Sequence, residues 1–347
     1  MFNEKQKKDM RRKIMLIYLL KHMYPEKKDI YDIEQRALMN LLSKKVVQNK
    51  KNDCFTEIDS HYFTFSEGKL WWPTINSFVC DNSPLILFEE QPCNFSNKEL
   101  IELTFDFYRS TDIKTFNIFN EIYKKSKNLI YFSKLKRNQN LHGLTTYSYL
   151  FDTSYITVFK NGKYIDLKAI IHEFGHAINN TLNFNIELHK SYEEIVSTFF
   201  ELISQEYFEN IGMEQATVNR LNDYEKKKNH IKDIQTILQI YKYLSNHDYP
   251  FLKSETILHN YNKNELNELF LNFNFEYYIY TTGFIVAVNL FLIYIKDKEY
   301  ALYLLYKIIG FNHLEDKDFF QTLKEYNLTS IDSLYTYSDY IKRRILK

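Results

Sequence analysis

Two histidines separated by three residues are the part of this sequence best suited to chemistry. His172, Glu173 and His176 form an H-E-x-x-H motif. Residues i and i+4 of a helix lie one above the other on the same face, so both imidazoles can bind one zinc ion at about 2.0–2.1 Å. Zinc activates a water molecule, and the glutamate between the histidines can take its proton. The motif therefore predicts a hydrolytic zinc site, with a chance match on a surface helix as the alternative.

A catalytic zinc ion has three protein ligands and one open position, so a further ligand is expected downstream. The candidates are Glu187, His189, Glu193 and Glu194. Glu194 is favoured because it begins a polar stripe at positions i, i+3, i+4 and i+7 of an otherwise apolar segment. That stripe consists of Glu194, Ser197, Thr198 and Glu201. A buried polar stripe needs partners, which a metal ion and its surroundings supply. A solvated helix face is the alternative reading of the stripe, and His189 would imply another ligand set.

The elements that must position these residues are mainly helices. The chain has 347 residues with only 7 glycines and 5 prolines, which are the strongest helix breakers. Residues 144–165 differ, because they are rich in strand formers and contain the turn dipeptide Asn161-Gly162. A strand, a turn and a short return are expected there, as a small antiparallel sheet beside a helix that starts near Asp166. From that point the chain is predicted to be helical almost to its end.

Upstream of the motif the pattern is less regular, and a boundary near residue 95 is expected. Ser96 and Glu99 have the spacing of a capping box, which predicts the start of a helix. The expected elements are helices over residues 9–24 and 31–49, short strands within 51–95, and helices over 96–109 and 112–126. The predicted organisation is an N-terminal helical or mixed region, 1–95, followed by a catalytic domain, 96–347.

Composition excludes some classes of partner and site. Lys and Arg number 45 against 44 Asp and Glu, so the formal charge of +1 gives no sign of a nucleic-acid partner. Cys54, Cys80 and Cys93 have no paired spacing, which argues against a disulfide framework and suits a cytoplasmic location. The segment Tyr277–Ile295 carries no charge and has nearly the length of a membrane span. Its tyrosines, threonines and asparagine favour a buried core helix instead.

Taken together, the two motifs resemble those of the M3 family of metallopeptidases, in particular oligoendopeptidase F. The H-E-F-G-H sequence at 172–176, followed by E-x-x-S-T-x-x-E at 194–201, is similar to that family's pair of zinc motifs. The resemblance implies a helical gluzincin-type fold, Glu194 as the third zinc ligand and Glu201 as a carboxylate close to it. It covers roughly residues 96–347. The other similar segments are Tyr155–Val158 with Gly162, Phe275–Gly283, and Tyr300–Leu304 with Gly310.

The expected activity is that of a zinc-dependent endopeptidase that hydrolyses short peptides. Glu173 acts as general base and then passes the proton to the leaving amine. A hydroxyl of Tyr278 or Tyr280 donates a hydrogen bond to the oxyanion, with core packing as the alternative role of each ring. In a helix these two tyrosines point about 200° apart, whereas in a strand they share a face. The strand Tyr155–Phe159 is expected to pair with the extended substrate backbone.

Two alternatives are kept, and departures from the family pattern motivate the first of them. The chain is shorter before the motif, Asn179 stands where the family usually has another histidine, and a second histidine is replaced near Phe270. One alternative is a zinc-containing peptide-binding protein without catalysis. The other is a protein anchored in a membrane through residues 277–295.

Overall fold

The computed structural model describes residues 87–134, 142–148, 150–183, 190–244, 276–310 and 316–345, with short stretches and single positions before residue 80. The chain divides into two compact units. Residues 90–184 and 204–215 contribute to the first unit, and residues 185–203 and 216–347 contribute to the second. Most residues of the helices and strands predicted before residue 95 lie outside the described residues, and the division at residue 95 stays a prediction.

Two helices of the first unit begin where their capping residues predict. Helix α5, Asn97–Thr111, starts after Ser96, whose hydroxyl accepts a hydrogen bond from the Glu99 amide at 3.1 Å. The Glu99 carboxylate accepts in return from the Ser96 amide at 2.7 Å, which completes the capping box. Helix α6, Ile113–Ser126, starts after Asp112, which accepts from the Thr115 amide at 2.8 Å. Both predicted helices are confirmed.

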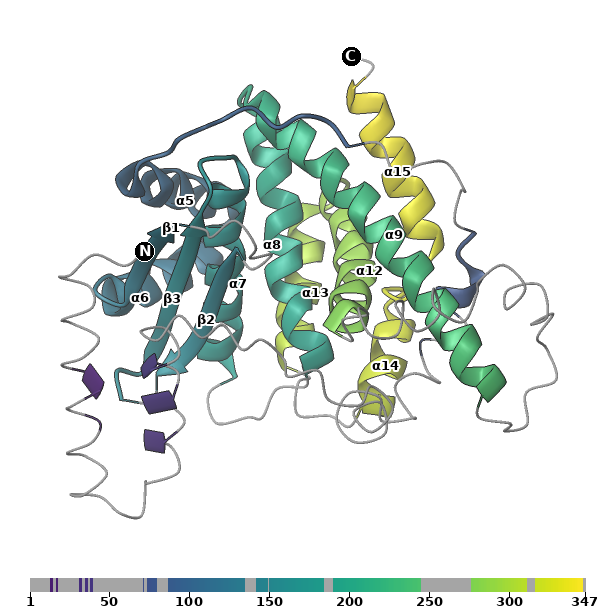
Figure 1. Cartoon of the computed structure of the whole chain (residues 1–347), viewed down its shortest axis with the longest axis horizontal. Coiled ribbons are helices and arrows are strands. Elements are labelled where there is room, and N and C mark those ends of the chain that lie inside the picture. Colours follow the sequence, from purple (N-terminus) through teal and green to yellow (C-terminus); the bar gives the residue numbers. More distant parts are fainter. Residues whose placement is uncertain are drawn as a thin grey trace. The chain divides into compact units, whose positions relative to one another are not determined.

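A three-stranded sheet follows in the first unit. It contains β1, Ile130–Lys134, β2, Gly143–Ser148, and β3, Thr153–Lys160, in the order β1-β3-β2. Strands β2 and β3 are antiparallel, as expected, but β1 pairs with β3 in parallel, so the sheet is mixed. The sequence prediction lacked β1 because its partner lies beyond β2 in the chain, and local alternation does not report such pairing. Figure 1 shows α7, Ile165–Leu182, beside these strands.

The turn at Asn161-Gly162 leads from β3 into α7 and not into a return strand. Gly162 has φ 82°, a conformation that favours glycine. The Asp166 carboxylate accepts hydrogen bonds from the amides of Asn161 and Gly162, at 2.8 and 2.9 Å. These bonds fix the turn against the first turn of α7, because Asp166 belongs to that helix. The antiparallel return of the sheet lies instead between β2 and β3.

The second unit is helical in all of its long described segments. It contains the first part of α8, Lys190–Asn210, nearly all of α9, Glu214–Leu244, and then α12, Glu276–Tyr294, α13, Lys298–Gly310, α14, Asp316–Glu325, and α15, Asp332–Ile345. Residues Phe284–Val288 of α12 are buried, and the Phe291 ring packs 5.5 Å from that of Tyr337 on α15. The prediction of a buried core helix is therefore confirmed. Among the described residues, no helix is both long enough and apolar enough to cross a bilayer. The mainly helical class with a small sheet is also confirmed.

Candidate metal centre

The two histidines of the motif stand out on α7 because the rest of the helix around them is buried. From Ile165 to Asn179, His172 and His176 are the two positions that remain partly accessible. Their Nε2 atoms lie 2.9 Å apart, and the rings meet at 80° with centroids 4.6 Å apart. A chance motif on a surface helix would have polar, exposed neighbours. The burial of the neighbouring residues on α7 argues against that alternative.

The distance between the two Nε2 atoms is close to that expected for two ligands of one zinc ion. Two nitrogen ligands, each about 2.0–2.1 Å from zinc, are roughly 3.3 Å apart at the tetrahedral angle. The observed separation of 2.9 Å between the Nε2 atoms of His172 and His176 is close to that value. The pair therefore fits as two ligands of one ion.

The carboxylate of Glu173 is held against the edge strand β2. Its residue is 4% exposed, and the Thr145 hydroxyl lies 2.6 Å from Oε2 and 3.0 Å from the Glu173 backbone oxygen. A Cβ atom at Gly143 would lie 2.1 Å from Oε1 of the same carboxylate. Residues two apart in a strand face the same side, so Gly143 and Thr145 contact Glu173 together. Neither residue carries a sequence signal of this role, because only the packing of β2 on α7 gives it to them.

The orientation of α7 is fixed from its other side by aromatic residues of α5 and α6. The Tyr108 hydroxyl donates to the backbone oxygen of Ile171 at 3.1 Å. The Tyr108 ring stacks on Phe119 at 4.3 Å, and Phe119 meets Phe174 edge-on at 4.9 Å. Ile171 precedes His172 and Phe174 follows Glu173, so these contacts fix the rotation of α7 about its own axis at the motif. They stabilise the geometry of the histidine pair.

Glu194 lies on α8, in the second unit, and the stripe that it begins is buried. Glu194 is 8% exposed, Ser197 0% and Thr198 3%, so the alternative of a solvated helix face is wrong for this part of the stripe. The Ser197 hydroxyl lies 3.4 Å from Oε2 of Glu194 and 3.2 Å from its backbone oxygen. A Cβ atom at Gly283 would lie 2.8 Å from the Glu194 Cβ, so glycine lets α12 approach α8 closely there.

The other ligand candidates cannot be placed. Glu187 and His189 lie outside the described residues, and for Glu193 only the helix is described. The assignment of a third ligand therefore depends on Glu194 and its surroundings.

The two candidate tyrosines both lie in the first turns of α12, so the extended arrangement is excluded. At about 100° per residue, Tyr280 lies about 60° from the direction of Gly283 around the helix, and Tyr278 about 140°. Because Gly283 contacts Glu194, Tyr280 lies nearer the face that carries this contact. The Lys227 ammonium lies 5.1 Å from the centre of the Tyr280 ring. For Tyr278 the structure describes the backbone alone.

Asn179, which stands where the M3 pattern usually has a histidine, has a structural role here. Asn179 is 1% exposed, and the Asn183 side-chain amide donates to its backbone oxygen at 3.0 Å and to its Oδ1 at 2.9 Å. This pair stabilises the last turn of α7. Phe270 lies outside the described residues.

The strand prediction for substrate pairing needs a correction. Strand β3, which contains Tyr155–Phe159, is the centre of the sheet, with β1 on one edge and β2 on the other. A peptide therefore cannot add to it. The outer edge of β2 has no strand partner among the described residues, and β2 is the strand that contacts Glu173.

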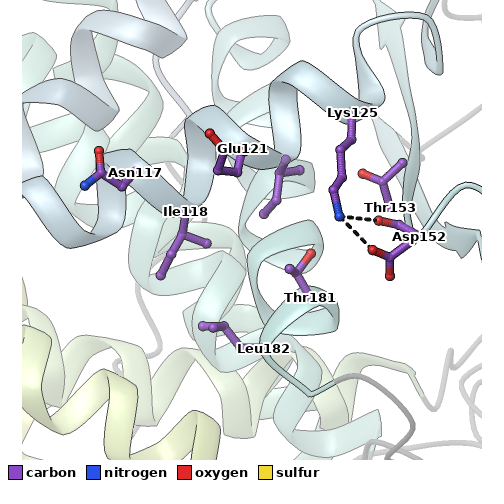
Figure 2. Close-up of a pocket in the computed structure, with 9 residues that line it drawn as sticks. Asn117, Ile118, Glu121, Lys125, Asp152, Thr153, Thr181 and Leu182 are labelled. Carbon is purple, nitrogen blue, oxygen red and sulfur yellow. Dashed lines mark hydrogen bonds and ion pairs between the residues drawn. The ribbon is translucent and has the colours of Figure 1, made fainter.

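A separate cavity of about 280 Å³ lies elsewhere in the first unit. It is lined by residues of α6 and the end of α7, among them Ile118 and Leu182. Figure 2 shows Lys125 at its margin, paired with Asp152 at 2.6 Å. The lining includes no residue of the histidine motif, so this cavity is distinct from the candidate metal centre.

Comparisons with known proteins support the fold. The chain is similar to a protein provisionally assigned as oligoendopeptidase F from Bacillus anthracis str. Ames, with a TM-score of 0.56, 16% identity, and coverage of 94% of this chain and 65% of that one. A protein provisionally assigned as a peptidase from Chlamydophila abortus has a TM-score of 0.55 and 13% identity over 96% and 62% of the two chains. PZ peptidase A, solved with an inhibitor, has a TM-score of 0.54 and 14% identity over 94% and 67%.

These identities show a shared fold and no more. The chain spans 65% and 62% of the lengths of the first two structures. No protein-family model and no curated protein matches the sequence.

Proposed function

We propose that this chain is a zinc-dependent endopeptidase that hydrolyses bonds in short peptides. The observation that carries the proposal is the arrangement on α7: two converging imidazoles within a stretch, Ile165–Asn179, that is otherwise buried, with the carboxylate of Glu173 between them in sequence. Histidine pairs with this spacing bind zinc, and the intervening glutamate serves as the base of metalloproteases. The fold shared with oligoendopeptidase-like and PZ peptidase structures adds support.

His172, His176 and Glu194 are the proposed zinc ligands. Each of the three side chains offers a donor atom that zinc binds in proteins: a ring nitrogen from either histidine and a carboxylate oxygen from Glu194. Two imidazoles and one carboxylate are a ligand set of catalytic zinc, which leaves one coordination position for substrate or water. A zinc ion at this position supplies Lewis-acid chemistry that polarises the peptide carbonyl.

The chain's own residues supply the proton transfers and the binding of the substrate. Glu173 accepts a proton from the attacking water and returns it to the nitrogen of the leaving amine. Tyr280 is the proposed hydrogen-bond donor to the developing oxyanion, because it lies nearer than Tyr278 to the Glu194 side of α12. An extended peptide would pair with the outer edge of β2, next to Glu173.

Metal analysis of matched variants tests this proposal. Purified protein should contain about one zinc ion per chain, as a site with three protein ligands predicts. His172→Ala and His176→Ala should lose zinc and peptide cleavage together. Glu173→Gln should keep zinc and lose cleavage, because an amide cannot accept the proton.

Two results would count against this function. Wild-type protein without zinc, purified without chelators, would contradict the metal site. Zinc and peptide binding without cleavage would favour the alternative of a non-catalytic peptide-binding protein.

A further inference from the structure

The side chain of Thr145 on β2 contacts the proposed base directly, with its hydroxyl 2.6 Å from the carboxylate of Glu173. We propose that Thr145 is a positioning residue, whose hydroxyl orients the carboxylate of Glu173 for proton transfer. This role rests on the proposed peptidase function, because it acts through Glu173. It goes beyond the zinc ligands and the base, since Thr145 belongs to no part of the zinc motifs.

The hydroxyl of Thr145 has one hydrogen and two neighbouring acceptors on the same residue. It lies 2.6 Å from Oε2 of Glu173 and 3.0 Å from the Glu173 backbone oxygen. A hydrogen bond to a carboxylate is shorter and stronger than one to a neutral acceptor. The proton therefore points to Oε2, and the 2.6 Å separation matches a bond between a hydroxyl and a carboxylate.

The strand fixes Thr145, so the bond fixes the carboxylate. Thr145 stands opposite Ile156 of β3 in the antiparallel register, and Gly143 stands opposite Val158. Threonine is branched at Cβ, which restricts rotation about χ1. On the other side of the carboxylate, Oε1 occupies the space that a side chain at Gly143 would fill. A Cβ atom at Gly143 would lie 2.1 Å from Oε1. One oxygen is thus hydrogen-bonded and the other is enclosed, which leaves the carboxylate little freedom.

Thr145→Val tests the hydroxyl without changing the shape of the side chain. Displacement of a catalytic group can lower the rate roughly 10- to 100-fold, so kcat should fall in that range. The KM for a cleaved peptide should stay nearly unchanged, because the substitution leaves the backbone of β2, with which the peptide would pair, as it is. The zinc content should also stay unchanged, because Thr145 is not a proposed ligand. Thr145→Ser keeps the hydroxyl and should restore most of the lost kcat. Thr181→Val is the matched control, because it removes a threonine hydroxyl that donates to the Ala177 backbone oxygen at 2.8 Å near the end of α7, and it should leave kcat unchanged.

A second readout tests the contact without turnover. In metal-free protein, Thr145→Val should lower Tm because Glu173 is buried and loses a hydrogen-bond donor. In a Glu173→Ala background the same substitution should lower Tm much less, since the partner is gone. Equal Tm shifts in the two backgrounds would overturn the contact.

The kinetic outcomes separate this proposal from the proposed function. Thr145→Val with wild-type kcat at full zinc occupancy, or Thr145→Ser as inactive as Thr145→Val, would overturn the positioning role while the peptidase function stands. A wild-type protein that binds zinc and cleaves no peptide would overturn both, although the Tm coupling would still record the contact.

Discussion

Gly143→Ala offers a direct perturbation of the proposed base, because the added methyl group meets the carboxylate of Glu173. Its carbon would lie 2.1 Å from Oε1 and 2.6 Å from both Cδ and Cγ of Glu173. Ordinary contacts between carbon atoms are about 3.5–4.0 Å, so the end of the side chain must retreat by about 1 Å or more. A misplacement of about 1 Å can reduce the rate roughly 100-fold, and we expect kcat to fall by that factor.

The fold should tolerate this substitution, since the atoms that must move belong to the end of a flexible side chain. Replacing glycine by alanine in a strand stabilises the folded state by roughly 0.5–1 kcal/mol. Loss of the Thr145–Glu173 hydrogen bond would destabilise it by about 1–3 kcal/mol, so the two effects partly cancel. Tm should therefore change by only a few degrees, because the net change in the free energy of unfolding is small.

The assay is kcat and KM for a cleaved peptide at matched zinc content, with Leu144→Ala as the control. Leu144 is 39% exposed and faces the other side of β2, so its truncation should leave kcat unchanged. In a Glu173→Gln background, Gly143→Ala should have no further effect, because the base is already lost. Wild-type kcat for Gly143→Ala with zinc bound would refute the reasoning that Glu173 must occupy this position to act as base.

Three further predictions address the tyrosines, the third ligand and the pH dependence of stability. Tyr280→Phe should lower kcat about 10²–10³-fold with Tm nearly unchanged, whereas Tyr278→Phe should have little effect on kcat. A large loss of kcat in Tyr278→Phe and none in Tyr280→Phe would contradict the choice of Tyr280 as oxyanion donor. Glu194→Ala should weaken zinc binding in a competition assay with a chelator. Wild-type zinc affinity in Glu194→Ala, together with weakened zinc binding in His189→Ala, would identify His189 as the third ligand instead. Burial, followed by two neighbouring lysines, lowers the pKa of His230 to about 4, against about 6.5 in an unfolded chain. Between these values the unfolded state binds more protons, so Tm should fall as pH decreases from about 6.5 to about 4, and less steeply in His230→Gln; identical slopes would contradict a buried neutral histidine.

Local signals in the sequence were sufficient for several elements of the fold. Ser96 with Glu99 predicted the start of α5, because a capping box is made by residues within one turn. The scarcity of glycine and proline predicted the long helices of the second unit. The motif on α7 was visible because its spacing of four residues is close to the helical repeat of about 3.6 residues, so both histidines share one face.

Contacts between distant segments were not predictable in the same way. The parallel pairing of β1 with β3 joins strands that are not neighbours in sequence, and it makes the strand that was expected to pair with the substrate the central one. The roles of Gly143 and Thr145 depend on which side of β2 faces α7, and a threonine in a strand is ordinary by composition. The choice between Tyr278 and Tyr280 needed the helical state of α12 and its contact at Gly283.

Cleavage of a random peptide library, followed by mass spectrometry, tests the central claim most directly. Zinc-loaded wild-type protein should produce internal cleavage of short peptides. Glu173→Gln at the same zinc content should produce essentially none, because it retains the metal ligands and lacks the base. An intact library after incubation with zinc-loaded wild-type protein, or equal cleavage by both proteins, would contradict the account.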